Sequence, residues 1–318
     1  MVTLQQIEPR TPITNLPVTI TQPGSYYVTT NLTVTPSAYG VLIEADNVTV
    51  DLNGFALVGV TGSDGGVQVV GVHTNICVRN GSVLNWPLGG VSLSNARNGQ
   101  LADLRASGNG STGLSIGDAG LVVRCSATGN GGAGIDASFG QGCIVKDCAV
   151  VQNAEGGIYL GNGSTAISCT VVSNTLYGIH IPGVGCTVKD CVVMASTAQG
   201  IFAGGRCVVR DCTASGNGGD GIEVVGDSLV VGCLSSSNAA SAAGISALGS
   251  VGGNRIEDNN VTDNGIGINL ISTGNLMIGN SAHNNATNYV FSSSDTYGTT
   301  NNLVGPITNQ NAWANLSY

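Results

Sequence analysis

Charge is scarce in this sequence. Charged residues make up 9% of the 318 residues, and aromatic residues 4%, whereas about 25% is charged in a typical globular chain. Ten Lys and Arg stand against 19 Asp and Glu, which gives a net charge of −9. A nucleic-acid-binding protein needs a basic surface, so this composition argues against that class. No apolar run approaches the ~20 residues of a membrane-spanning helix, and we expect no membrane span.

The first residues, 1–6, lack the basic and apolar regions of a secretory signal. We therefore expect no signal peptide in this chain, unless one has been removed, and the compartment stays open. What the sequence does contain is Gly, at 49 residues, and Asn, at 31 residues. Its hydrophobic content of 42% argues against disorder.

A repeat of about 22 residues organises these residues. Each unit has a Cys, an Asn five residues later, and a Gly-Ile or Gly-Leu pair that ends ten residues after the Cys. The Cys column comprises Cys125, Cys148, Cys169, Cys191, Cys212 and Cys233. The Asn column comprises Asn109, Asn130, Asn153, Asn174, Asn217 and Asn238, with Ser196 as its one substitution. The Gly column comprises Gly113, Gly134, Gly157, Gly178, Gly200, Gly221 and Gly244.

A period near 22 is compatible with a leucine-rich repeat or a parallel β-helix. Leu is sparse here, and no window keeps a helical period for ten residues. Short alternating segments of Val, Ile and Thr, broken by Gly and Asn, predict short strands, as in 144–151. We therefore predict an all-β fold, a single-stranded right-handed parallel β-helix of about eleven coils at about 4.8 Å per coil.

In such a solenoid each column becomes a ladder. The Ile and Cys columns are expected to point inward, with Cys acting as a small hydrophobe. We expect the Asn column to occupy a turn position with positive φ. The Gly column is expected at a tight bend without room for a Cβ atom. The pairs Lys146-Asp147, Lys189-Asp190 and Arg210-Asp211 precede the Cys column and predict exposed ion pairs.

We expect residues 1–40 to form an N-terminal cap, 41–295 the β-helix, and 296–318 a C-terminal cap or tail with Trp313 and Tyr318 as anchors. An uncapped β-helix end is an unpaired edge that invites polymerisation.

The segment Asn47–Phe55 (NVTVDLNGF) and the repeated Cys-x4-Asn-x3-Gly-Ile unit resemble right-handed β-helix repeat proteins of the pectin-lyase-like superfamily, over roughly residues 24–292. The resemblance implies the fold and favours an extracellular or cell-surface protein. Members include polysaccharide lyases, glycoside hydrolases, uronan epimerases, phage tailspikes and non-catalytic scaffolds, so the fold does not select an activity. The Asp-Pro-His-Glu signature of mannuronan epimerases is absent here.

The ten Cys are expected to be buried free thiols. Cys143, Cys186 and Cys207 form a second partial column, each five residues before a Cys of the first. An even number of Cys would suit disulfides in a secreted chain, but in-register side chains that point the same way make poor disulfide geometry. No CxxC pair or nearby His indicates a metal site, and we expect no metal and no cofactor.

The residue after each Gly-Ile pair is expected to point outward. This outward ladder comprises Gln68, Ser92, Ser115, Asp136, Tyr159, His180, Phe202, Glu223, Ser246 and Asn269. Tyr177 and Asp220 precede two of the same glycines. Aromatic faces stack on sugar rings, and acids bind hydroxyls or transfer protons. We therefore place catalytic candidates at Tyr159, His180 and Glu223, and substrate-binding candidates at Asp136, Tyr177, Phe202 and Asp220.

A Tyr159–His180 pair, one coil apart, would supply the base and acid of a lyase or epimerase. Asp136 and Glu223 are four coils apart, about 19 Å, too far for the carboxylate pair of a hydrolase. No Lys or Arg falls in the ladder, which argues against uronate chemistry because that chemistry needs a cation near the carboxylate.

The sequence thus favours a carbohydrate-interacting β-helix that binds or modifies a polysaccharide, and it leaves open whether the protein is an enzyme. One alternative is a structural protein whose rods self-associate end to end or side by side. Another is a phage-type spike. The simplest alternative is that the outward ladder is merely exposed.

Overall fold

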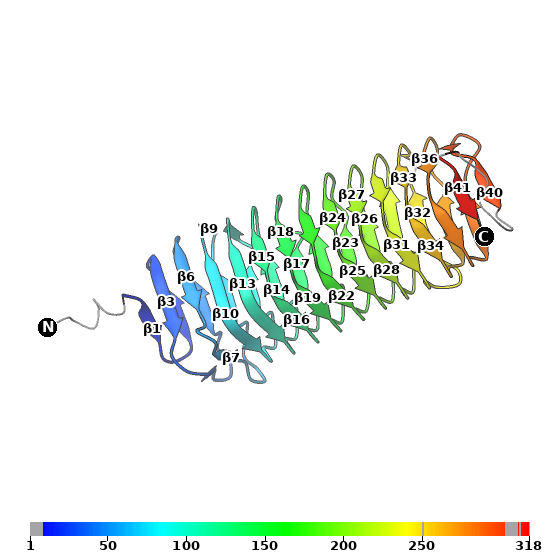
Figure 1. Cartoon of the computed structure of the whole chain (residues 1–318). Helices are drawn as coiled ribbons and strands as arrows, with labels where there is room; N and C mark the ends of the chain where they lie inside the picture. Colours follow the sequence, from blue (N-terminus) through cyan, green and yellow to red (C-terminus); the bar gives the residue numbers. More distant parts are fainter. Residues whose placement is uncertain (1–8, 250, 303–310, 312, 318) are drawn as a thin grey trace. The chain divides into compact units, whose positions relative to one another are not determined.

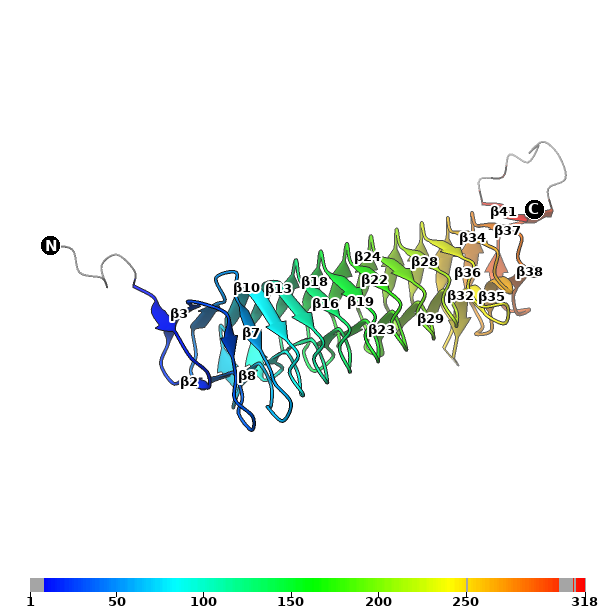
Figure 2. The same cartoon turned by 90° about the horizontal axis from the view of Figure 1, so that it is seen from below.

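The computed structural model describes residues 9–249, 251–302, 311 and 313–317. Within these residues every regular element is a β-strand, and the chain is a parallel solenoid of about 12 turns, close to the predicted eleven. The chain comprises two compact units, residues 1–159 and 160–318. In each unit the short strands stack turn upon turn in the same direction (Figures 1 and 2). No helix in the described part of the chain has the length and apolar character needed to cross a membrane.

The first unit forms two main parallel sheets and one short pair. Sheet A contains β1 (Thr11–Ile13), β3 (Gly24–Val28), β4 (Leu32–Thr33), β6 (Val48–Asp51), β7 (Ala56–Val58), β10 (Cys77–Leu84), β13 (Gln100–Ser107), β15 (Leu121–Val123), β16 (Ser126–Thr128), β18 (Ile144–Lys146) and β19 (Ala149–Val151). Sheet B contains β2 (Val18–Ile20), β5 (Val41–Ile43), β8 (Val67–Val69), β11 (Val91–Leu93), β14 (Leu114–Ile116) and β17 (Ile135–Ala137). The pair is β9 (His73–Thr74) with β12 (Ala96–Arg97). The unit boundary falls inside β20 (Ile158–Leu160).

The second unit repeats the two sheets. Sheet A contains β21 (Thr165–Ile167), β22 (Thr170–Val172), β24 (Thr187–Lys189), β25 (Val192–Met194), β27 (Val208–Arg210), β28 (Thr213–Ser215), β30 (Leu229–Val231), β31 (Leu234–Ser236), β33 (Arg255–Glu257), β34 (Asn260–Thr262), β36 (Leu276–Ile278), β37 (Ser281–His283), β39 (Thr296–Tyr297), β40 (Thr300–Asn302) and β41 (Asn315–Ser317). Sheet B contains β23 (Ile179–Ile181), β26 (Ile201–Ala203), β29 (Ile222–Val225), β32 (Ala243–Leu248), β35 (Ile266–Leu270) and β38 (Thr287–Val290).

The interior of each unit is a set of matched apolar ladders. In the second unit Ile179, Ile201 and Ile222 are fully buried, and they pair in register from one turn to the next. Because strand side chains alternate between the two faces, their burial places the next residue of each strand on the outer face of sheet B. The predicted inward Ile column is confirmed.

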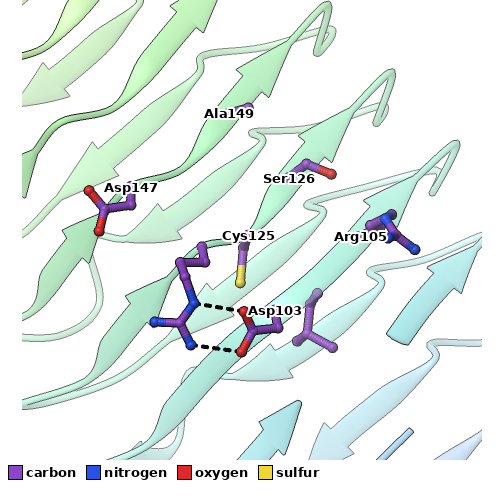
Figure 3. A pocket seen from close by; sticks show the side chains of 8 residues that line it. Asp103, Arg105, Cys125, Ser126, Asp147 and Ala149 are labelled. Carbon is purple, nitrogen blue, oxygen red and sulfur yellow. Dashed lines mark hydrogen bonds and ion pairs between the residues drawn. The ribbon is translucent and has the colours of Figure 1, made fainter. Parts of the chain in front are cut away.

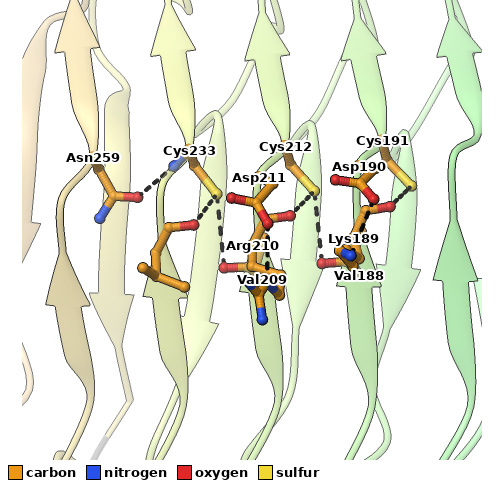
Figure 4. A network of polar contacts seen from close by, with 11 residues as sticks. Val188, Lys189, Asp190, Cys191, Val209, Arg210, Asp211, Cys212, Cys233 and Asn259 are labelled. Atoms are coloured by element: carbon orange, nitrogen blue, oxygen red, sulfur yellow. Dashed lines mark hydrogen bonds and ion pairs between the residues drawn. The ribbon is translucent and has the colours of Figure 1, made fainter.

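The cysteines are free, and nine of the ten are buried, with Cys77 half-buried. Figure 4 shows Cys191, Cys212 and Cys233 in successive turns of the second unit. Each thiol donates to main-chain carbonyls: Cys212 Sγ lies 3.1 Å from Arg210 O and 3.7 Å from Val188 O. The thiols therefore fill the core and also satisfy carbonyl groups at the corner, and the prediction of buried free thiols is confirmed.

The predicted conformation of the Asn column is wrong. Positive φ occurs at the residue before each Asn, such as Gly216 (65°) and Ser237 (55°), and not at Asn217 or Asn238. Since the corner is made by that preceding residue, the Asn side chain is free to point inward. Asn217 Oδ1 accepts the backbone N–H of Ser196 at 3.0 Å, and its Nδ2 donates to Asn238 Oδ1 at 3.0 Å. The column is a buried amide ladder that satisfies the polar backbone of the corner.

The Gly column marks the close approach of successive turns, as predicted. A Cβ atom added at Gly200 would lie 2.6 Å from both the Gly221 carbonyl oxygen and Asn217 Nδ2. Neither backbone nor a buried amide can move away from such a contact. The column therefore fixes the bend that leads into each sheet B strand.

The exposed ion pairs are also confirmed. Lys189 Nζ lies 3.4 Å from Asp190 Oδ2, and Arg210 Nε lies 3.0 Å from Asp211 Oδ2.

The anchoring role predicted for Trp313 is wrong, because its side chain is 60% exposed. Tyr318 lies outside the described residues, as does the segment 1–8 of the predicted N-terminal cap.

Candidate functional site

Four consecutive strands of sheet B place the candidate residues on one face of the second unit. His180 of β23 pairs in register with Phe202 of β26, which in turn pairs with Glu223 of β29. Glu223 pairs with Ser246 of β32. The register of the predicted ladder therefore holds from His180 to Ser246, but only His180 and Phe202 are half-buried, whereas Glu223 is 8% exposed and Ser246 is fully buried. Neighbouring members lie about 4.8 Å apart, the strand spacing of a sheet.

Three aromatic rings form one cluster on this face. The ring centroids of Tyr177 and His180 are 4.2 Å apart with an interplanar angle of 27°. The centroids of His180 and Phe202 are 5.1 Å apart at 28°, and those of Tyr177 and Phe202 are 6.1 Å apart at 55°. All three side chains are half-buried. Burial lowers the pKa of the His180 imidazole, so the ring is uncharged at neutral pH and offers an apolar face.

Two carboxyl groups lie on the next turn. Glu223 is only 8% exposed, and its Oε2 accepts a hydrogen bond from Gln199 Nε2 at 2.6 Å. Burial raises the pKa of the Glu223 carboxyl; the Gln199 hydrogen bond opposes that rise, and the negative charge of Asp220 adds to it. Asp220 accepts the Ala243 N–H at 2.7 Å and the Ser246 hydroxyl at 2.5 Å. Both carboxyl groups are thus held in fixed positions beside the rings.

The sequence places these groups together through the Gly column. Tyr177, Gln199 and Asp220 each stand immediately before a glycine of that column, while His180, Phe202 and Glu223 follow two residues after it. The bend at the glycine brings the residue before it onto the same outer face as the residue after the Ile, as the Tyr177–His180 stack shows. Each turn therefore contributes two side chains to the face.

Gln199 is the residue that the sequence analysis missed. It occupies the same repeat position as Tyr177 and Asp220, and that register could have identified it. Ser246 was assigned to the ladder but to no role, and the structure makes it the hydroxyl donor to Asp220.

The two remaining candidates lie in the first unit. Asp136 pairs in register with Ser115, as the ladder predicts. Its Oδ1 accepts hydrogen bonds from Ser138 N at 2.9 Å and Ser138 Oγ at 2.6 Å, within its own turn. Tyr159 is half-buried on β20 and covers Gly156. The acid–base pairing of Tyr159 with His180 stays a prediction.

A surface hollow of about 380 Å³ lies at a corner of the first unit. It is lined by Asp103, Arg105, Arg124, Cys125, Ser126 and Asp147, among others. Figure 3 shows Asp103 at its centre. Arg124 closes on Asp103 through two hydrogen bonds of 2.7 and 2.8 Å. Arg124 and Asp103 thus satisfy one another, and Asp147 lies 3.7 Å from Lys146 Nζ.

Two family comparisons cover most of the chain. Residues 20–183 match the family described as "Right handed beta helix region", and residues 121–317 match the family described as "Periplasmic copper-binding protein (NosD)". No curated protein matches the sequence.

Similar solved structures share the fold at low identity. The A-module of the Azotobacter vinelandii mannuronan C-5 epimerase AlgE6 aligns with a TM-score of 0.56 and 14% identity, over 96% of this chain and 89% of that module. The corresponding AlgE4 module aligns at 0.52 and 13%, over 93% and 86%. The Dettilon tailspike protein aligns at 0.54 and 14%, over 92% of this chain; the present chain spans only 61% of the tailspike.

The side chains do not form a site that fits copper, which the second family description names. The described residues contain no group of three or more His, Cys, Asp and Glu side chains that could hold a metal ion. His73, His180 and His283 lie on β9, β23 and β37, on separate turns. The buried thiols, the softest ligands available, are hydrogen-bonded to backbone carbonyls, as at Cys212 and Cys233. We derive no chemistry through copper.

Proposed function

This chain belongs to the right-handed β-helix family and to the NosD family, and on that premise we propose that it binds a polysaccharide on the outer face of sheet B in the second unit. The observation that carries the proposal is the aromatic cluster of Tyr177, His180 and Phe202 directly beside Glu223 and Asp220. We call these five residues, with Gln199, the glycan face.

The chemistry of the glycan face suits sugar rings. Aromatic rings present flat apolar surfaces to the C–H faces of a sugar, and their burial contributes much of the binding energy at such surfaces. A carboxylate carries about four lone-pair sites, so Glu223 and Asp220 keep acceptor capacity for hydroxyl groups beyond the bonds they already receive. Gln199 and Ser246 hold those acceptors in place, which reduces the conformational entropy that the side chains lose on binding.

The similar structures support the proposal at the level of fold. Two of them are modules of mannuronan C-5 epimerases and one is a tailspike protein. A stack of short parallel turns presents a long regular surface to an extended polymer. Modification of the bound polymer is a finer hypothesis: Glu223, with its raised pKa, would be the proton donor of such a reaction.

A glycan array with variant proteins tests the function. We expect the native protein to retain one class of polysaccharide, and Tyr177→Ala and His180→Ala to lose most of that binding. Phe139→Ala is the matched control, because Phe139 is an aromatic residue that is 71% exposed and is not part of the glycan face. Binding that is equal in all four proteins would remove the glycan face from the proposal.

A second function is favoured by a different surface. The outer face of sheet A in the second unit exposes apolar side chains, with Val192 37%, Met194 40% and Leu234 38% exposed. Val192 and Leu234 stand in one register column with Thr213 between them. Exposed apolar side chains on one sheet face favour an association surface, and a second copy of this chain, packed side by side, would cover them. Size-exclusion chromatography with light scattering tests this: a dimer or larger species that Leu234→Lys converts to a monomer supports assembly, and a monomeric native protein contradicts it.

A further inference from the structure

We propose that the glycan face selects an uncharged glycan and excludes uronate polymers. This inference rests on the proposed function and specifies its ligand class. The mannuronan epimerases of similar fold would instead suggest a uronate polymer as the ligand.

The charge on the face is negative and uncompensated. The strands β23, β26, β29 and β32 contain no Lys or Arg, and neither do the two residues that precede each of them. Within these strands and the two residues before each of them, the acidic groups are Asp220 and Glu223. A uronate carboxylate placed on the aromatic cluster would meet like charge on the neighbouring turn, and like-charge juxtaposition suppresses binding strongly.

The cations of the second unit are engaged elsewhere. Its Lys and Arg are Lys189, Arg206, Arg210 and Arg255. Lys189, Arg210 and Arg255 lie on sheet A strands, and each is within 3.4 Å of an acidic side chain. Arg206 lies at a corner with φ of 57°, 3.9 Å from Asp227. None is on a sheet B strand, where it would neutralise a sugar carboxylate held against His180 or Phe202.

The groups that are present suit neutral sugars. Gln199 Nε2 and the Ser246 hydroxyl donate to the two carboxyl groups, which holds these carboxyl groups in place as acceptors for sugar hydroxyl groups. A uronate carboxylate is an acceptor only, and it would lie beside these two acidic side chains with no Lys or Arg on the same strands. The ligand class that matches this pattern is a polymer of neutral hexoses or N-acetylated hexosamines.

Affinity measurements on two matched sets of polymers test the inference. The native protein is titrated, at low salt, with neutral glucans and mannans and with alginate and polygalacturonate. We expect a neutral polymer to bind at least about tenfold more tightly than either uronate. The double variant Asp220→Asn with Glu223→Gln removes both charges. We expect it to bind the uronates more tightly than the native protein does, so that the ratio of neutral-polymer affinity to uronate affinity falls.

The possible outcomes separate the two proposals. Tighter binding of a uronate than of every neutral polymer, lost in Tyr177→Ala, would overturn the uncharged class but keep the glycan face. Absence of binding to all polymers would overturn the proposed function and the inference with it. Circular dichroism and the melting temperature establish that each variant is folded, and the single variant Glu223→Gln replaces the double variant if that does not fold.

Discussion

Gln199 donates its side-chain N–H to Glu223 across one turn of the solenoid, at 2.6 Å. The bond fixes a carboxyl group that is 8% exposed and whose pKa is raised above its ordinary value of 4.5, chiefly by burial. The folded protein therefore binds this proton more tightly than the unfolded chain does. The free energy of unfolding of the protein is therefore lowered above the raised pKa, where the buried carboxyl group is charged. It recovers as the pH falls towards 4.5.

Glu223→Gln removes that penalty while keeping an acceptor for Gln199. We expect the variant to melt at a higher temperature than the native protein at neutral pH, and the difference to disappear near pH 4. Thermal unfolding followed by circular dichroism at the two pH values measures this. The exposed Glu155→Gln provides the control. A native protein that is more stable than Glu223→Gln at neutral pH would contradict the burial argument.

The stack of His180 on Phe202 makes a second prediction. Burial lowers the pKa of His180, and the Phe202 ring, 5.1 Å away, supplies part of that cover. Phe202→Ala should let water reach the imidazole and raise its pKa towards the ordinary value of 6.5. An NMR titration of the native protein and of Phe202→Ala follows the His180 imidazole directly. An unaltered His180 titration in Phe202→Ala would show that the ring does not shield it.

The interior amide ladder has one break, at Ser196. Its Oγ is buried and has no hydrogen-bond partner, whereas the Asn217 and Asn238 side chains each donate to the Asn of the following turn. Ser196→Asn should restore the ladder and raise the free energy of unfolding by about 1 kcal/mol. Chemical denaturation measures the change, and Ser241→Asn, at an exposed position, is the control. A destabilised Ser196→Asn would mean that this turn lacks the space its neighbours have.

Much of the fold follows from the sequence because the repeat converts linear spacing into vertical stacking. The Cys, Ile and Gly columns could be assigned to the interior and the bend, since volume and Cβ clearance alone decide those positions. The Asn column could not be assigned correctly, because Asn suits both a positive-φ corner and a buried amide ladder. In the structure the positive φ of the corner occurs instead at the preceding residues, such as Gly216 and Ser237.

The candidate site could be predicted only in part. The register placed His180, Phe202 and Glu223 in line, and the structure confirms that line. The contacts between neighbouring columns were not predictable from spacing, because they depend on side-chain direction at the glycine bend. The hydrogen bonds from Gln199 to Glu223 and from Ser246 to Asp220 were missed for that reason.

The cysteine ladder predicts the reactivity of the thiols. Ten thiols should react with a thiol reagent in denaturant, because none of the ten cysteines is in a disulfide. In the folded protein Cys77 alone should react, since it is half-buried and the others are buried. Its reaction should still be slow at neutral pH, because burial raises the pKa of its thiol. Cys77→Ser should abolish the reaction of the folded protein with the thiol reagent. Fewer than ten thiols in denaturant would contradict the structure.

Polysaccharide binding by this protein requires that a glycan lie against the aromatic cluster of the second unit. The chain has only three histidines, so their imidazole NMR signals report on three separate places at once. On addition of a neutral polysaccharide fragment, we predict that the His180 signals shift in a saturable way while those of His73 and His283 stay in place. Saturable shifts of His73 or His283 with a stationary His180 would contradict the account.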